Sequence, residues 1–159
     1  MTEMACLRQT HCFSKTGFTL VELLVVIALL AILATIGIPN FGPTIANSRA
    51  TAAANDLLSA LQLARSEAVR LNEPVEMNPI DGSNWAVGWT IERPETIIRQ
   101  RGALARVTIA GPSEMEFGSA GNAVPAGSFE ITANSGGNPQ RCLTVTASGS
   151  ANVERGGCP

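Results

Sequence analysis

The chain has 159 residues, an apolar fraction of 45%, and 11 basic against 13 acidic side chains, which gives a formal charge of −2 at pH 7. The length suits about one domain. The acidic balance argues against a nucleic-acid-binding domain, because such domains usually carry a basic surface.

The longest apolar run covers residues 18–38, and its only charged side chain is Glu22. Its 21 residues are enough for a helix to cross a bilayer core, which needs roughly 20. Positive charge before a first apolar segment keeps that side cytoplasmic. Such charge is present here, in the segment that contains Arg8, His11 and Lys15. We therefore expect one membrane-spanning segment, with everything after Pro39 facing outward.

A secretory signal peptide and a plain transmembrane anchor are the simpler explanations of this run. A signal peptide has an apolar stretch of about 7 to 15 residues and ends in a small-x-small cleavage site, whereas this run is longer and contains no Ala-x-Ala. A plain anchor fits the length and the flanking charges. It does not explain Glu22, because a carboxylate inside a membrane is costly and needs a partner.

The sequence GFTLVE at residues 17–22, with Pro39 at the end of the apolar run, resembles the N-terminus of type IV prepilins. In that family a prepilin peptidase cuts after the glycine on the cytoplasmic side and methylates the new N-terminal amine. The apolar segment then serves as membrane anchor and later as filament core. The resemblance implies a leader of residues 1–17, cleavage between Gly17 and Phe18, N-methylation of Phe18, and anchoring in the bacterial inner membrane.

The resemblance also gives Glu22 a role in assembly. The free ammonium group of Phe18 in one subunit can pair with Glu22 of a neighbour, and a buried charge is tolerable once it is paired. We expect this pair to set the register between subunits. The implied partners are other major and minor pilins, the prepilin peptidase, the inner membrane and the pilus assembly machinery.

Beyond the apolar run, small and apolar residues recur at steps of three and four up to about Leu71, which predicts a second helical half. This stripe consists of Ala54, Leu57, Leu58, Leu61, Ala64 and Ala68. The whole helix would cover residues 18–71. Proline removes a backbone donor and clashes with the preceding turn, so we expect a kink at Pro39.

After Pro74 the sequence changes to short β-rich pieces separated by turns rich in Gly, Pro, Asn and Ser. The expected strands lie within residues 85–92, 96–100, 105–110, 114–117, 128–132 and 141–147. Strands at this spacing favour an antiparallel sheet. The predicted fold class is therefore α+β, in which a long N-terminal helix packs on a periplasmic β-rich head of residues 72–159.

Four motifs in the second half resemble the GspH/FimT family of prepilins. They are ARSEAVRLNEPVEM, WAVGWTI, EFGSAGNAVPAGSFEIT and RCLTVTASGSANV, at residues 64–77, 85–91, 116–132 and 141–153. The family contains FimU-like and FimT-like minor pilins and the H-type pseudopilin of type II secretion. The resemblance implies a type IV pilin-like fold and a minor pilin that helps to initiate a pilus at its tip, with the pseudopilin as an alternative.

Processing would remove Cys6, Cys12 and His11 with the leader and leave two cysteines. Since disulfides form and persist outside the cytoplasm, we expect a bridge between Cys142 and Cys158, with two unpaired thiols as the alternative. Without histidine the mature chain cannot form a Ser-His or Cys-His nucleophile, and zinc would need about four ligands. We expect a protein that is not an enzyme and has no cofactor or metal.

DNA uptake in natural transformation is the alternative from another functional class. Arg99, Arg101 and Arg106 are close in sequence, and a strand pair can gather them into a patch that contacts DNA. The leader contains two of the 11 basic and one of the 13 acidic side chains, so the mature charge is 9 minus 12, or −3. DNA-binding members of the family carry an arginine-rich C-terminal motif, where this chain offers only Arg155. A nucleic-acid partner is therefore disfavoured.

Processing is directly testable. The N-terminal peptide of the mature protein, analysed by mass spectrometry, should begin with methylated Phe18, because the residues around it match the prepilin cleavage motif. A mature chain that begins near Thr35 would show instead that residues 1–34 are a secretory signal peptide.

Overall fold

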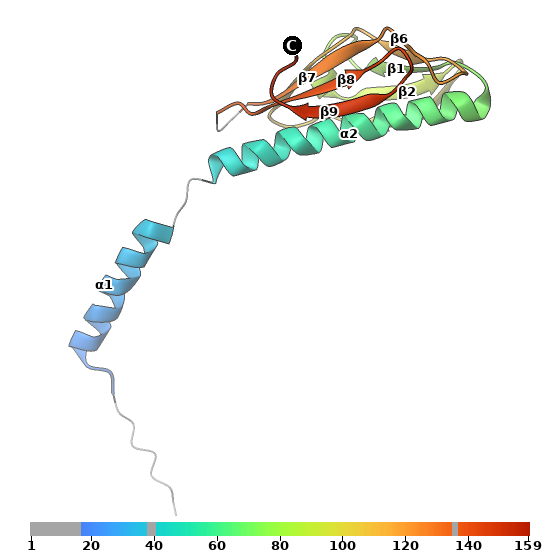
Figure 1. Cartoon of the computed structure of the whole chain (residues 1–159). Coiled ribbons are helices and arrows are strands. Elements are labelled where there is room, and N and C mark those ends of the chain that lie inside the picture. The colour runs from blue at the N-terminus through green and yellow to red at the C-terminus, as the bar shows by residue number, and fades with distance from the viewer. Residues whose placement is uncertain (1–16, 38–40, 135–136) are drawn as a thin grey trace, which may run out of the picture. The chain divides into compact units, whose positions relative to one another are not determined.

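The computed structural model describes residues 17–37, 41–134 and 137–159, and Figure 1 labels its helices and strands. The chain divides into two units, Met1–Pro39 and Asn40–Pro159. In the first unit, α1 extends over Leu20–Gly37. None of the helices in the described part of the chain combines the length and the hydropathy needed to cross a bilayer.

The second unit, called the head below, begins with the long helix α2, Gly42–Leu71. The proline next to its first residue suits a helix start, since that backbone nitrogen needs no intrahelical acceptor. Asn72 ends the helix in a left-handed conformation, with φ 55°, and its N–H donates to the carbonyl of Ala68. The buried residues of α2 form one stripe: Ala46, Ala50, Ala53, Ala54, Leu57, Ala60, Leu61, Ala64 and Ala68.

Two antiparallel sheets follow α2. The larger sheet has the order β3-β2-β1-β5-β6, with bounds Thr96–Arg101, Trp89–Arg93, Val75–Pro79, Met115–Phe117 and Ala123–Val124. The smaller sheet has the order β4-β7-β8-β9, with bounds Val107–Ala110, Gly127–Ala133, Gln140–Val145 and Ala151–Arg155. The α+β class with a helix on antiparallel sheets is confirmed.

The head has one main core, to which α2 and both sheets contribute. In Figure 1, α2 extends along the sheets with β9 at its side. Trp85 and Trp89 are both buried. The ring of Trp85 meets Phe129 edge to face, with centroids 5.1 Å apart, and its indole N–H donates to the carbonyl of Pro112 over 2.7 Å. The two tryptophans are therefore packing residues, as expected for aromatics near a sheet.

Four local elements differ from the prediction. Trp85 lies in a short 3-10 helix, Trp85–Val87, and not in a strand. The side chain of Asn84 caps this turn, and Gly88 follows with φ 117°, a conformation that other residues rarely adopt. Strands β1, β6 and β9 lie outside the expected strands. β1 contains polar residues and Pro79, which resemble a turn, and the two residues of β6 lie in a segment rich in Gly, Asn and Pro. In β1, alternate burial of Val75, Met77 and Pro79 reveals the strand.

Arg65 joins α2 to one turn from each sheet. Its Nε donates to the carbonyl of Gly121 in the β5–β6 turn, and its Nη2 donates to the carbonyl of Ser148 in the β8–β9 turn, both over 2.9 Å. The two turns touch at Gly149, where an added Cβ would lie 1.9 Å from the carbonyl oxygen of Gly121. Glycine at 149 thus permits the close approach that lets one guanidinium reach both carbonyls.

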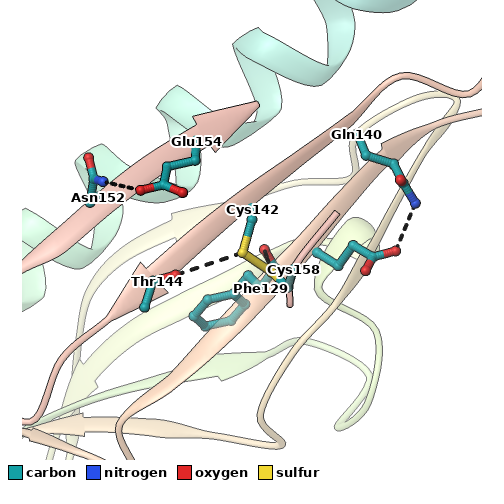
Figure 2. The surroundings of a disulfide bond; sticks show 8 residues. Phe129, Gln140, Cys142, Thr144, Asn152, Glu154 and Cys158 are labelled. Carbon is teal, nitrogen blue, oxygen red and sulfur yellow. Dashed lines mark hydrogen bonds between the residues drawn. A yellow bond between two sulfur atoms is a disulfide. The ribbon is translucent and has the colours of Figure 1, made fainter. Parts of the chain in front are cut away.

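A disulfide bond joins the C-terminal segment to the smaller sheet. Cys142 of β8 is bonded to Cys158, which follows β9, with their Cα atoms 4.9 Å apart, as Figure 2 shows. The Sγ of Cys158 lies 3.5 Å from the carbonyl oxygen of Phe129 on β7. The predicted pairing is confirmed, and it fixes the segment after β9 to the middle of the sheet.

The tight contact at Gly149 predicts a specific loss of stability. Gly149→Ala should destabilise the head by about 1–3 kcal/mol more than Gly82→Ala, because overpacking adds to the backbone strain. Gly82 is a matched control, since its φ of 79° is close to the 77° of Gly149 but its Cβ would meet nothing within 4 Å. Urea unfolding of residues 40–159 measures both. Equal losses for the two variants would contradict the close approach.

The disulfide should contribute about 3 kcal/mol, since its sequence separation is 16 residues. Reduction should therefore lower the melting temperature of the head by several degrees. The double variant Cys142→Ser/Cys158→Ser should have the melting temperature of the reduced protein, and reductant should not change it. Two free thiols in non-reducing peptide mapping of protein isolated from the periplasm would contradict the bridge.

Candidate functional site

The predicted cleavage site lies just before α1. Residues 17–19 form no regular secondary structure, and α1 starts at Leu20. Phe18 is 77% exposed, and nothing lies within 4 Å of where a Cβ of Gly17 would be. The bond between Gly17 and Phe18 is thus accessible in the subunit, which is what a peptidase requires. Cleavage itself remains a prediction.

Glu22 lies in the first turn of α1. Its backbone N–H donates to the hydroxyl of Thr19 over 3.2 Å, so the T-x-x-E pattern of residues 19–22 matches one half of a capping box. An acidic side chain is also favourable at the positive end of the helix dipole. Sequence analysis missed this local reason for a glutamate here. No ion pair among the described residues includes Glu22, so its carboxylate can bind a partner.

The three arginines proposed for DNA contact lie on two different elements. Arg99 and Arg101, both on β3, line a small cavity of about 110 Å³ together with Asp56, Ser59, Ala60 and Trp89. Arg101 forms an ion pair with Asp56, with Nη2 and Oδ2 2.9 Å apart. Arg106 lies in the turn before β4, in the other sheet, with φ 58°. The ion pair with Asp56 therefore neutralises part of the positive charge that phosphates would need.

The carboxyl groups whose pKa values are shifted, Asp81 and Glu67, each accept hydrogen bonds from residues close to them in sequence. Backbone N–H groups of Asn84 and Ser83 lower the pKa of the Asp81 carboxyl, which stabilises the turn before the 3-10 helix. A hydrogen bond from Arg70 lowers the pKa of Glu67. Within the described ranges, no group of three or more His, Cys, Asp or Glu residues could hold a metal ion.

Two arginines with unexpected positions, Arg65 and Arg141, were not identified from the sequence. Arg65 lies outside the apolar stripe that the sequence predicted between Ala54 and Ala68. Arg141 is only 7% exposed and points toward α2. The burial of Arg141 could have been inferred from the sequence, because Arg141 alternates with the buried residues Leu143 and Val145 along the same strand. Pro39 lies outside the described residues, so the kink remains a prediction.

Comparison with known proteins identifies both parts of the chain. The family described as Type II transport protein GspH matches residues 53–149, and the prokaryotic N-terminal methylation motif matches residues 12–38. No curated protein matches the chain. Two crystal structures of the Pseudomonas aeruginosa (strain PAO1) type IV minor pilin FimU are similar to it.

One FimU structure is 23% identical, with a TM-score of 0.60, over 67% of this chain and 89% of the pilin. The other is 25% identical, with a TM-score of 0.58, over 65% of this chain and 91% of the pilin. This likeness shows that the chain and the FimU structures share a fold. Because the GspH match covers more than half of the chain, this protein belongs to the GspH family and carries an N-terminal methylation motif at its start.

Proposed function

We propose that this protein is a FimU-like minor type IV pilin that is processed by prepilin peptidase, anchored in the inner membrane, and then incorporated at low copy into the initiating complex at the pilus tip. The observation that carries the proposal is the order of its parts. A methylation motif over residues 12–38 contains Gly17, Phe18 and the apolar helix α1, with Glu22 in its first turn. A GspH head similar to the FimU head follows.

The exposed side chains of α1 support assembly in a filament or membrane. In the single subunit its apolar side chains are between 42% and 79% exposed: Leu20, Val21, Leu23, Leu24, Val25, Val26, Ile27, Leu29, Leu30, Ile32 and Leu33. Such a surface is unfavourable in water, and it becomes buried when helices of neighbouring subunits or lipid surround it. Glu22 at the start of this helix then pairs with the methylated ammonium group of a neighbouring Phe18, so that neither charge remains alone.

A role as the H-type pseudopilin of type II secretion is the second candidate, because the matching family model describes a type II transport protein. Both candidates are structural subunits and would use the same N-terminal chemistry. DNA uptake is the weaker alternative, since the ion pair between Arg101 and Asp56 neutralises part of the proposed contact.

Deletion of the gene should reduce the number of surface pili, and the wild-type gene should restore them. Glu22→Ala should insert into the membrane but enter filaments poorly, because the lost pair acts between subunits. Glu22→Gln separates the two roles of this residue: glutamine still fits a capping box but has no charge, so it should fail like alanine. Pili counted by electron microscopy, and the variant measured in sheared filaments, give the result.

Other outcomes identify the alternatives. Normal piliation with failed export of secreted enzymes would assign the chain to type II secretion. Normal piliation, together with sub-micromolar and salt-sensitive DNA binding that is abolished by changing Arg99, Arg101 and Arg106, would assign it to DNA uptake. Normal filament entry of Glu22→Gln would mean that Glu22 only starts the helix.

A further inference from the structure

Arg141 is a buried charge that has no acidic partner among the described residues. Its guanidinium donates to neutral acceptors: Nη1 to the carbonyl of Gln140 over 2.6 Å, and Nη2 to Asn47 Oδ1 and, over 3.0 Å, to Thr51 Oγ1. Arginine stays charged at every physiological pH. A buried charge without a counter-charge is costly even when its hydrogen bonds are satisfied.

The acidic side chains on the elements around Arg141 lie on the other face of the sheet or are paired with another residue. On β7 and β9, Glu130 and Glu154 are the register partners of Cys142, so they occupy the opposite face of the sheet from Arg141. There Glu130 accepts from Gln140, and Glu154 accepts from Asn152. Figure 2 labels the pair of Asn152 and Glu154. On α2, Asp56 pairs with Arg101. The helix-facing side of this sheet therefore carries positive charge without a balancing carboxylate.

A second arginine increases the positive charge at the same place. The register of β8 and β9 puts Arg155 directly opposite Arg141, where side chains share a face with Cβ atoms about 4.5–5.5 Å apart. Like charges in such a pair are destabilising. Arg155 is exposed, and it forms no ion pair with any described residue. Two arginine side chains thus extend from paired positions of β8 and β9 on the same face of the sheet.

We propose that this arginine pair, Arg141 and Arg155, docks a carboxylate on the head of a neighbouring pilin. This inference rests on the proposed function and deepens it by naming a contact surface of the head. The incoming carboxylate binds the exposed guanidinium of Arg155 and lowers the electrostatic cost of Arg141 beneath it. Asn47 and Thr51 hold the guanidinium of Arg141 in place, and the exposed side chain of Arg155 is available to the partner.

A protein carboxylate fits this surface better than a nucleic acid does. The positive charge is concentrated at two side chains, one of them nine-tenths buried, whereas a phosphate backbone needs several exposed basic groups along its length. The chain as a whole is acidic. A guanidinium binds a carboxylate through two parallel N–H···O bonds, so one exposed guanidinium suits a single carboxylate.

The test uses the full-length protein in piliated cells. Arg155→Glu should lower the fraction of this protein in sheared filaments roughly tenfold or more, because a buried contact between opposite charges becomes a repulsion. Arg155→Lys should stay near wild type, since it keeps the charge. Arg99→Glu is the matched control, because Arg99 is also an exposed strand arginine that forms no ion pair with any described residue, and it should enter filaments normally.

A photo-crosslinking residue at Gly157, an exposed position two residues after Arg155, supplies an independent readout that leaves Arg155 in place. It should join this head to another pilin within a peptide that contains Asp or Glu, and changing that acid to lysine should restore entry of Arg155→Glu. Wild-type protein absent from filaments would overturn the proposed function and this inference together. Wild-type protein present and Arg155→Glu equally present would overturn this inference alone. In that case, loss of duplex DNA binding in Arg155→Glu would assign the pair to nucleic acid.

Discussion

The head depends on one constraint: a single face of α2 must close a core that two separate sheets share. Most of the buried residues on that face are alanines, and short side chains let the helix backbone approach both sheets closely. The large side chains of this core come mainly from the sheet side, among them Trp85, Trp89, Phe117 and Phe129. Burial of these groups provides most of the favourable free energy of folding, and without α2 both sheets would expose their apolar faces.

Hydrogen bonds from two arginines link both ends of α2 to the sheets. Arg65 binds backbone carbonyls near the last turns of α2, and Arg141 binds side chains near its first turns. Each guanidinium offers five donors in a rigid plane, so it can satisfy acceptors from several segments at once. The difference between the two is burial. Arg65 is partly exposed to water, whereas Arg141 is not, which is why the second carries a cost that a partner can relieve.

Periodic features of the fold could be read from the sequence, whereas features that depend on register could not. The stripe on α2 was visible because its spacing of three and four persists from Ala54 to Ala68. Strand β1 was missed because Pro79 and its polar residues resemble a turn until pairing with β2 reveals their alternation. The position of Arg155 opposite Arg141 follows only from the β8–β9 register. At Glu22 the sequence suggested a partner in another subunit, but the hydrogen bond to Thr19 adds a reason within the helix itself.

The distribution of contacts along α2 also has a mechanical consequence. Its first turns contribute Ala46 and Ala50 to a small cluster with Ala133, separate from the main core. The same turns also accept hydrogen bonds from Arg141. Tension that reaches the head through its N-terminal end therefore meets a weakly held segment first. A pull along the helix axis loads the whole buried stripe in shear, but a pull away from the sheets would peel these turns off one at a time. The head should thus yield gradually at Gly42–Thr51 while the core from Ala53 onward stays closed.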